Sequence, residues 1–98
     1  MILDDLHAVI LDRINNPRPG SYVSSLLIKG KDEILKKIGE EAIEVIVASK
    51  SGDREQVIRE LADLWFHCMV LMPEHGLSHN DIFRELEQRF NKKENHHD

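Results

Sequence analysis

Residues 53–72 read DREQVIRELADLWFHCMVLM, and this stretch decides the fold. Asp53 and Gln56 are placed as a capping-box pair at its start, and Pro73 with Gly76 ends it. Its apolar residues form two neighbouring stripes on a helical wheel: Val57, Leu61, Leu64, Cys68 and Leu71 in one, Ile58, Ala62, Trp65, Met69 and Met72 in the other. A helix that is apolar over so much of its circumference must be covered on several sides. We therefore expect a homodimer whose core is a helical bundle shared by the two chains.

The other segments also predict helices. Apolar residues recur with helical spacing over residues 2–15, 32–51 and 78–90, and residues 21–29 predict a short helical turn that stops at Gly30. Asp32 is expected to cap the helix that it begins. No stretch alternates apolar and polar residues, so we expect no strand. The sequence predicts an all-α protein of about four to five helices, with a single domain over residues 1–91 and a frayed tail over residues 92–98.

The composition narrows the possible classes of protein. The chain has 98 residues, of which 41% are hydrophobic and 32% charged, and this balance excludes wholesale disorder. The net charge of −5 argues against non-specific nucleic-acid binding, which needs a basic face. No apolar stretch approaches the roughly 20 residues that cross a bilayer, and the first residues carry acids where a secretory signal carries Lys or Arg. We expect a cytoplasmic protein with no membrane or nucleic-acid partner.

Five carboxylates lie at helical spacing inside otherwise apolar helices. Glu40, Glu41 and Glu44 occur in GEEAIEV, and Glu60 and Asp63 occur in RELADLW. Two antiparallel helices can bring both groups face to face, where a cation must neutralise them. Mg²⁺ prefers such oxygen ligands and often bridges to substrate phosphates. Each pair alone is typical of an exposed acidic face, but together, in helices this apolar, they favour a metal site.

Lys37 and His67 are also placed near these carboxylates. Lys37 lies one turn before Glu40 and Glu41, so it is positioned either to meet a phosphate or to form a simple helical ion pair with Glu41. His67 lies one turn beyond Asp63; it is a candidate for substrate contact, although a histidine satisfied between helices is the favoured reading.

A row of hydroxyl groups follows the hinge at residues 15–20. Ser21, Tyr22 and Ser25 are candidates to bind phosphate or sugar oxygens, and helix caps and turns use serines in the same way. Trp65 and Phe66 are able to stack a base, but we expect both to pack in the core.

The motifs EEAIE and ELAD resemble the EExxE…ExxD signature of the all-α nucleoside triphosphate pyrophosphohydrolases. Within that superfamily, SYVSSLLIKGKDEILKKIGEEAIEVIVASKSGD and ELADLWFHCMVLM are similar to the phosphoribosyl-ATP pyrophosphohydrolase family of histidine biosynthesis. The resemblance covers residues 19–89. It implies a cytoplasmic homodimer that uses Mg²⁺ to cleave the α–β phosphoanhydride of phosphoribosyl-ATP. It also implies metal-ligand roles for Glu41, Glu44, Glu60 and Asp63, and a role for Glu40 in orienting or deprotonating the attacking water.

The chain departs from the pattern of this family at two places. The family more often has an aliphatic residue and Tyr where this chain has Trp65 and Phe66, and Pro73 shortens the long helix. Two other functions are compatible with the residues: a house-cleaning pyrophosphohydrolase that acts on free nucleoside triphosphates, and a non-catalytic helical dimerisation module.

Overall fold

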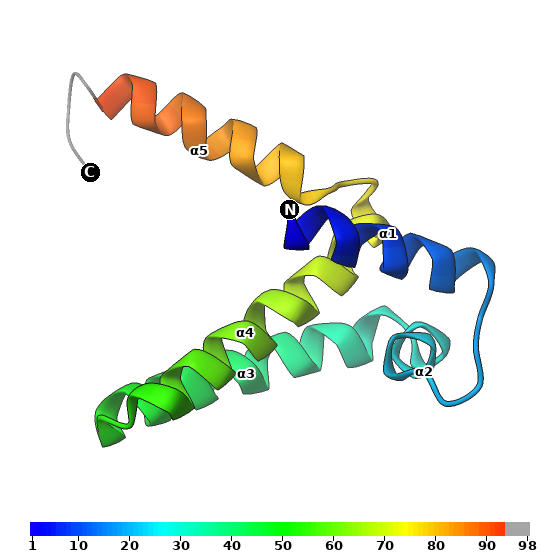
Figure 1. Ribbon diagram of the computed structural model, residues 1–98, viewed down its shortest axis with the longest axis horizontal. Coiled ribbons are helices and arrows are strands. Elements are labelled where there is room, and N and C mark those ends of the chain that lie inside the picture. The colour runs from blue at the N-terminus through cyan, green and yellow to red at the C-terminus, as the bar shows by residue number, and fades with distance from the viewer. Residues whose placement is uncertain (94–98) are drawn as a thin grey trace.

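A computed structural model describes residues 1–93, and every regular element in this range is helical (Figure 1). The all-α prediction is therefore confirmed. In chain order the elements are α1 (Ile2–Asn15), α2 (Tyr22–Lys29), α3 (Lys31–Ser51), α4 (Arg54–Leu71), the 3₁₀ turn η1 (Met72–His75) and α5 (His79–Lys93).

Helices α3 and α4 form an antiparallel hairpin that projects from the rest of the molecule (Figure 1). Gly52 ends α3 in the left-handed region, with φ of 79°, and Asp53 caps α4 by accepting hydrogen bonds from the backbone N–H of Glu55 and Gln56. The capping-box prediction is only half right, because the Gln56 side chain turns away from the cap and donates to Glu60 at 2.6 Å. This tight connection holds the two carboxylate-bearing helices side by side.

The core lies where the base of this hairpin meets α1 and α2. Six side chains form it: Ile10, Val23, Leu26, Ile34, Met69 and Val70. Two of them, Val23 and Leu26, belong to the short helix α2, whose N-terminus is capped by Ser21 accepting a hydrogen bond from the backbone N–H of Ser24. The core thus holds α2 against the base of the hairpin.

The predicted helix ends need three corrections. Asp32 does not cap α3, because α3 already begins at Lys31 and Gly30, with φ of 100°, joins it directly to α2. Helix α4 ends at Leu71, one residue early, and η1 follows. Helix α5 continues to Lys93, beyond the expected end near Phe90, so residues 92 and 93 are helical; the rest of the predicted frayed tail, residues 94–98, lies outside the described part of the chain.

The single chain is extended: α1 and α2 lie at one end, and α5 and the α3–α4 hairpin reach toward the other end as two separate arms (Figure 1). Its radius of gyration is 15.5 Å, against roughly 13 Å for a compact domain of about 100 residues. Among residues 1–93, no helix combines the length and apolarity that crossing a bilayer requires.

Candidate metal centre

Three of the predicted carboxylates meet between α3 and α4. One oxygen of each of Glu41, Glu60 and Asp63 lies within 4.8 Å of the others. Two ligand oxygens of an octahedral Mg²⁺ ion are roughly 3 to 4.2 Å apart, depending on whether they are neighbours or opposite. The donors are all hard oxygens, and their 4.8 Å limit lies only slightly above this range, so a small movement of the side chains would bring them around a divalent cation such as Mg²⁺.

The electrostatics of the group point the same way. Burial raises the pKa of Glu41, and the nearby negative charges of Asp63 and Glu60 raise that pKa further. The uncharged Gln56 amide donates a hydrogen bond to Glu60 but brings no positive charge. An excess of negative charge remains, which a cation would relieve.

The other two predicted carboxylates lie outside this group. Glu44 is one turn further along α3 and exposed, and it is not among the carboxylates that come within 4.8 Å. Glu40 is also exposed, and the Lys37 Nζ atom lies 3.8 Å from its Oε1 atom. Lys37 thus pairs with Glu40 rather than with Glu41, the ion pair that the sequence suggested.

A pocket of about 420 Å³ opens beside the carboxylates. Its lining comes from three helices and consists of Tyr22, Lys37, Glu41, Asp63, Phe66 and His67. All of these residues except Phe66 are predicted site residues, five in number, and the fold brings them to one place from three separate stretches of sequence.

His67 is buried and makes two hydrogen bonds. Its Nδ1 atom lies 2.8 Å from the backbone oxygen of Asp63, and its Nε2 atom lies 2.8 Å from the Tyr22 hydroxyl. The favoured reading of a histidine satisfied between helices agrees with these bonds, yet the residue also lines the pocket. Tyr22 is thereby joined to α4.

The hydroxyls of Ser21 and Ser25 serve the backbone of α2. Ser21 is the N-cap, and the Ser25 hydroxyl donates to the carbonyl of Tyr22 at 2.7 Å. Neither serine lines the pocket. Of the three candidates in this row, only Tyr22 presents its side chain there.

Sequence reasoning missed the roles of Gln56 and Phe66. Gln56 precedes Glu60 by one helical turn, and this spacing was a signal for the hydrogen bond that forms. Phe66 stacks on Tyr22, with ring centroids 5.9 Å apart, and so forms a wall of the pocket. The expectation of a core position is wrong for Trp65 in the single chain, where it is 60% exposed.

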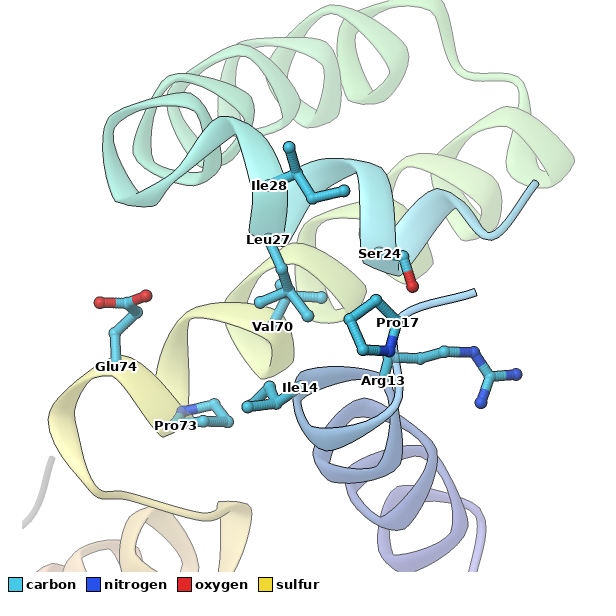
Figure 2. A pocket seen from close by; sticks show the side chains of 9 residues that line it. All are labelled: Arg13, Ile14, Pro17, Ser24, Leu27, Ile28, Val70, Pro73 and Glu74. Carbon is cyan, nitrogen blue, oxygen red and sulfur yellow. The ribbon is translucent and has the colours of Figure 1, made fainter. Parts of the chain in front are cut away.

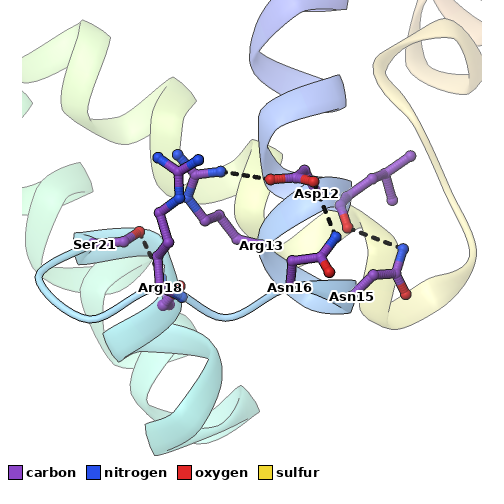
Figure 3. Close-up of polar contacts among 8 residues, drawn as sticks. Asp12, Arg13, Asn15, Asn16, Arg18 and Ser21 are labelled. Atoms are coloured by element: carbon purple, nitrogen blue, oxygen red, sulfur yellow. Dashed lines mark hydrogen bonds and ion pairs between the residues drawn. The ribbon is translucent and has the colours of Figure 1, made fainter.

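Another cleft, of about 500 Å³, lies where α1, α2 and η1 meet (Figure 2). Its interior is mostly apolar, with Ile14, Leu27 and Val70, and the guanidinium group of Arg13 points away from them. That group binds Asp12 at 2.7 Å, in a set of polar contacts that closes the end of α1 (Figure 3). The cleft therefore resembles the carboxylate pocket in size but lacks its chemistry.

The fold and the site together define a class of protein. It is an all-α protein with a cluster of three carboxylates suited to a divalent cation, beside a pocket that a lysine lines. The chain belongs to the phosphoribosyl-ATP pyrophosphohydrolase family, whose model matches residues 3–90. The resemblance seen in the sequence is thereby confirmed.

Individual relatives match most of the chain. A phosphoribosyl-ATP pyrophosphatase of Sulfurisphaera tokodaii is 52% identical over 90% of this chain and 94% of its own length. One of Geotalea daltonii is 49% identical, over 91% of this chain and 84% of the relative. The histidine biosynthesis bifunctional protein HisIE of Caldanaerobacter subterraneus is 47% identical over 93% of this chain, which corresponds to 44% of that longer protein.

Proposed function

We propose that this protein catalyses the reaction of its family name in histidine biosynthesis: hydrolysis of the α–β phosphoanhydride of phosphoribosyl-ATP to phosphoribosyl-AMP and pyrophosphate. The observation that carries the proposal is the group formed by Glu41, Glu60 and Asp63 at the edge of a pocket that Lys37 also lines. Family membership indicates the substrate, and the three clustered carboxylates indicate that a bound cation takes part in its hydrolysis.

The substrate linkage carries several negative charges, so an attacking water needs cationic help. Glu41, Glu60 and Asp63 would hold Mg²⁺, and Glu44 would be the fourth ligand by its position in the motif. When bound, the ion supplies charge neutralisation for the triphosphate and for the departing pyrophosphate. This explains why the chain maintains a crowded group of like charges.

Glu40 and Lys37 have complementary roles in this proposal. Glu40 is exposed next to the carboxylate group and would orient or deprotonate the attacking water. The Lys37 ammonium, 3.8 Å from Glu40, donates only and would hold phosphate oxygens of the substrate. Their ion pair keeps the Glu40 side chain close to Lys37, which lines the pocket.

We propose a cytoplasmic homodimer as the working form. Exposed apolar side chains on both hairpin helices support the dimer: Ile43 is 62% exposed, Ile46 60% and Ile58 47%. Large apolar side chains concentrated on one element favour a partner that covers them.

A substrate comparison tests the reaction. Purified protein with Mg²⁺ is given phosphoribosyl-ATP, ATP or dUTP in parallel, and pyrophosphate and orthophosphate are measured separately. We expect pyrophosphate from phosphoribosyl-ATP, no orthophosphate before pyrophosphatase is added, and loss of the signal with a chelator. Faster release from ATP or dUTP would assign the protein to house-cleaning instead, and release from none of the three would favour the dimerisation module.

A further inference from the structure

The hydrogen bonds of His67 fix which atom donates to which. The backbone oxygen of Asp63 accepts only, so the Nδ1 atom of His67, 2.8 Å away, carries the proton. In the neutral imidazole the Nε2 atom then has a lone pair and no proton. The Tyr22 hydroxyl, 2.8 Å from Nε2, must therefore donate its single proton to His67.

The Tyr22 oxygen is left with lone pairs alone for anything else that it meets. Its ring is held by Phe66, whose plane is inclined by 26° to it, and by His67, which lies edge-on at 89°. The side chain is still 48% exposed and lines the pocket. Tyr22 thus offers the pocket a positioned hydrogen-bond acceptor.

The opposite polarity comes from Lys37, which lines the same pocket and offers only donors. Phosphate oxygens of a nucleotide at neutral pH accept hydrogen bonds, so Lys37 and a cation suit them and Tyr22 does not. A ribose hydroxyl donates, and the ribose is bonded directly to the α-phosphate. A hydroxyl of this ribose is therefore the hydrogen-bond donor of the substrate that lies nearest to phosphates held at the carboxylate cluster.

We infer that Tyr22, oriented by His67, accepts a hydrogen bond from a hydroxyl of the ribose that carries the triphosphate, and so sets the direction in which the nucleotide lies in the pocket. This inference rests on the proposed function. It assigns to Tyr22 recognition of the sugar rather than of phosphate, and to His67 the role of a positioning residue. Ser21 and Ser25, whose hydroxyls serve the backbone, have no part in it.

The test pairs a change in the protein with a change in the substrate. Tyr22→Phe removes the acceptor and keeps the ring that stacks on Phe66. The substrates are phosphoribosyl-ATP and its 2′-deoxy and 3′-deoxy analogues, altered in the ribose next to the triphosphate. For wild type we expect one analogue to lose about three- to tenfold in kcat/KM, the range of one neutral hydrogen bond. Tyr22→Phe should lose a similar factor on the intact substrate and nothing further on that analogue.

Two further variants separate recognition from general damage. Ser49→Ala removes an exposed hydroxyl from the far end of α3 and should keep the full wild-type preference for the intact ribose. His67→Phe removes the acceptor for the Tyr22 proton and should abolish the preference while Tyr22 is still present. His67→Gln, whose amide oxygen can reach the position of Nε2, should restore part of it.

The outcomes are distinguishable. If wild type cleaves phosphoribosyl-ATP but Tyr22→Phe keeps the same preference among the three substrates, the inference is overturned and the proposed function stands. If folded wild type releases no pyrophosphate from phosphoribosyl-ATP, the proposed function fails and the inference falls with it. Additive losses from the Tyr22 and substrate changes are the same contrary result, because Tyr22 and the ribose hydroxyl would then act independently.

Discussion

At the scale of single residues, Glu41 is a carboxylic acid that lies beside two others, Glu60 and Asp63. Burial and the charges of Asp63 and Glu60 all raise its pKa, so its ionised form is disfavoured in the folded protein without metal. A folded-state pKa above the unfolded one means that metal-free stability declines as pH rises through the raised value. A bound cation reverses this by favouring the ionised form.

Glu41→Gln should therefore raise the melting temperature of the metal-free protein at neutral pH and abolish the further rise that Mg²⁺ gives wild type. Thermal unfolding with and without Mg²⁺ measures both effects. Glu55→Gln, which changes an exposed acid in the first turn of α4, should leave the Mg²⁺ response intact. An unchanged response in Glu41→Gln would remove Glu41 from the ligand set, and the same measurement on Glu44→Gln decides whether Glu44 belongs to it.

Lys37→Ala should lower kcat/KM for phosphoribosyl-ATP by roughly tenfold to a hundredfold, since a charge-assisted hydrogen bond contributes about 1.5 to 3 kcal/mol. The affinity of the free protein for Mg²⁺ should stay the same or rise, because a positive charge beside the carboxylates has gone. Steady-state kinetics and Mg²⁺ titration together check this. Near-normal kinetics would show that Lys37 does not bind the substrate and only forms a helical ion pair with Glu40.

At the scale of elements, one buried histidine joins the first and last helices. His79 at the start of α5 is only 2% exposed, and its Nε2 atom lies 2.7 Å from the Asp4 Oδ1 atom of α1. The His7 ring packs edge-on against His79, and the N-terminal ammonium lies 3.0 Å from the other Asp4 oxygen. Asp4 therefore connects α1 to α5.

The pKa of Asp4 is lowered by the hydrogen bond from His79 and by the one from the N-terminus. A lowered folded-state pKa contributes stability above the ordinary value of 3.8 and loses it as pH falls through the lowered value. Asp4→Asn should be less stable than wild type near neutral pH, with the gap closing in acid. Denaturant unfolding between about pH 2.5 and 7 tests this linkage. The free energy of unfolding of Asp5→Asn, at the exposed neighbouring position, should follow pH in parallel with that of wild type. A parallel pH profile for Asp4→Asn would show that the ionisation of Asp4 does not contribute to stability.

At the scale of the whole molecule, much apolar surface faces solvent. Trp65 and Leu86 are 60% and 54% exposed, and they border an apolar groove of about 310 Å³ between α1, α4 and α5. Ile43 and Ile46 on α3 and Ile58 on α4 are exposed as well, so one chain leaves apolar side chains of both hairpin helices uncovered. Packing within a single chain therefore covers only part of the apolar surface of residues 53–72.

Light scattering should therefore give a mass of twice 11.4 kDa for wild type at micromolar concentration. Ile58→Glu, at a position 47% exposed in the single chain, should lower that mass or cause aggregation, because a charge would enter the interface. Met69→Glu should unfold the protein outright, since Met69 is 3% exposed within the core. Circular dichroism separates the two results, and a well-behaved wild-type monomer would contradict the dimer.

Local sequence was sufficient for the helices and for the meeting of Glu41, Glu60 and Asp63. Helical spacing repeats within a few residues, and Ser21 and Asp53 cap through backbone groups two or three residues away, so these features depend on little beyond the local chain. The tight turn between α3 and α4 then makes the two helices antiparallel neighbours, which brings the carboxylates on their facing sides close together. Asp32 was misread because the conformation of Gly30, not a side chain, starts α3.

Only the packing of distant elements could place Tyr22 on His67, across 45 residues, or Asp4 on His79, across 75. Both pairs depend on the angles at which α2 meets α4 and α1 meets α5, and no periodicity in the sequence carries those angles. The exposure of Glu44 and of Trp65 has the same origin, since a helical wheel says which residues share a face but not which face a neighbour covers. The side chains that line the pocket, and hence the polarity that it offers a nucleotide, are set by that tertiary arrangement.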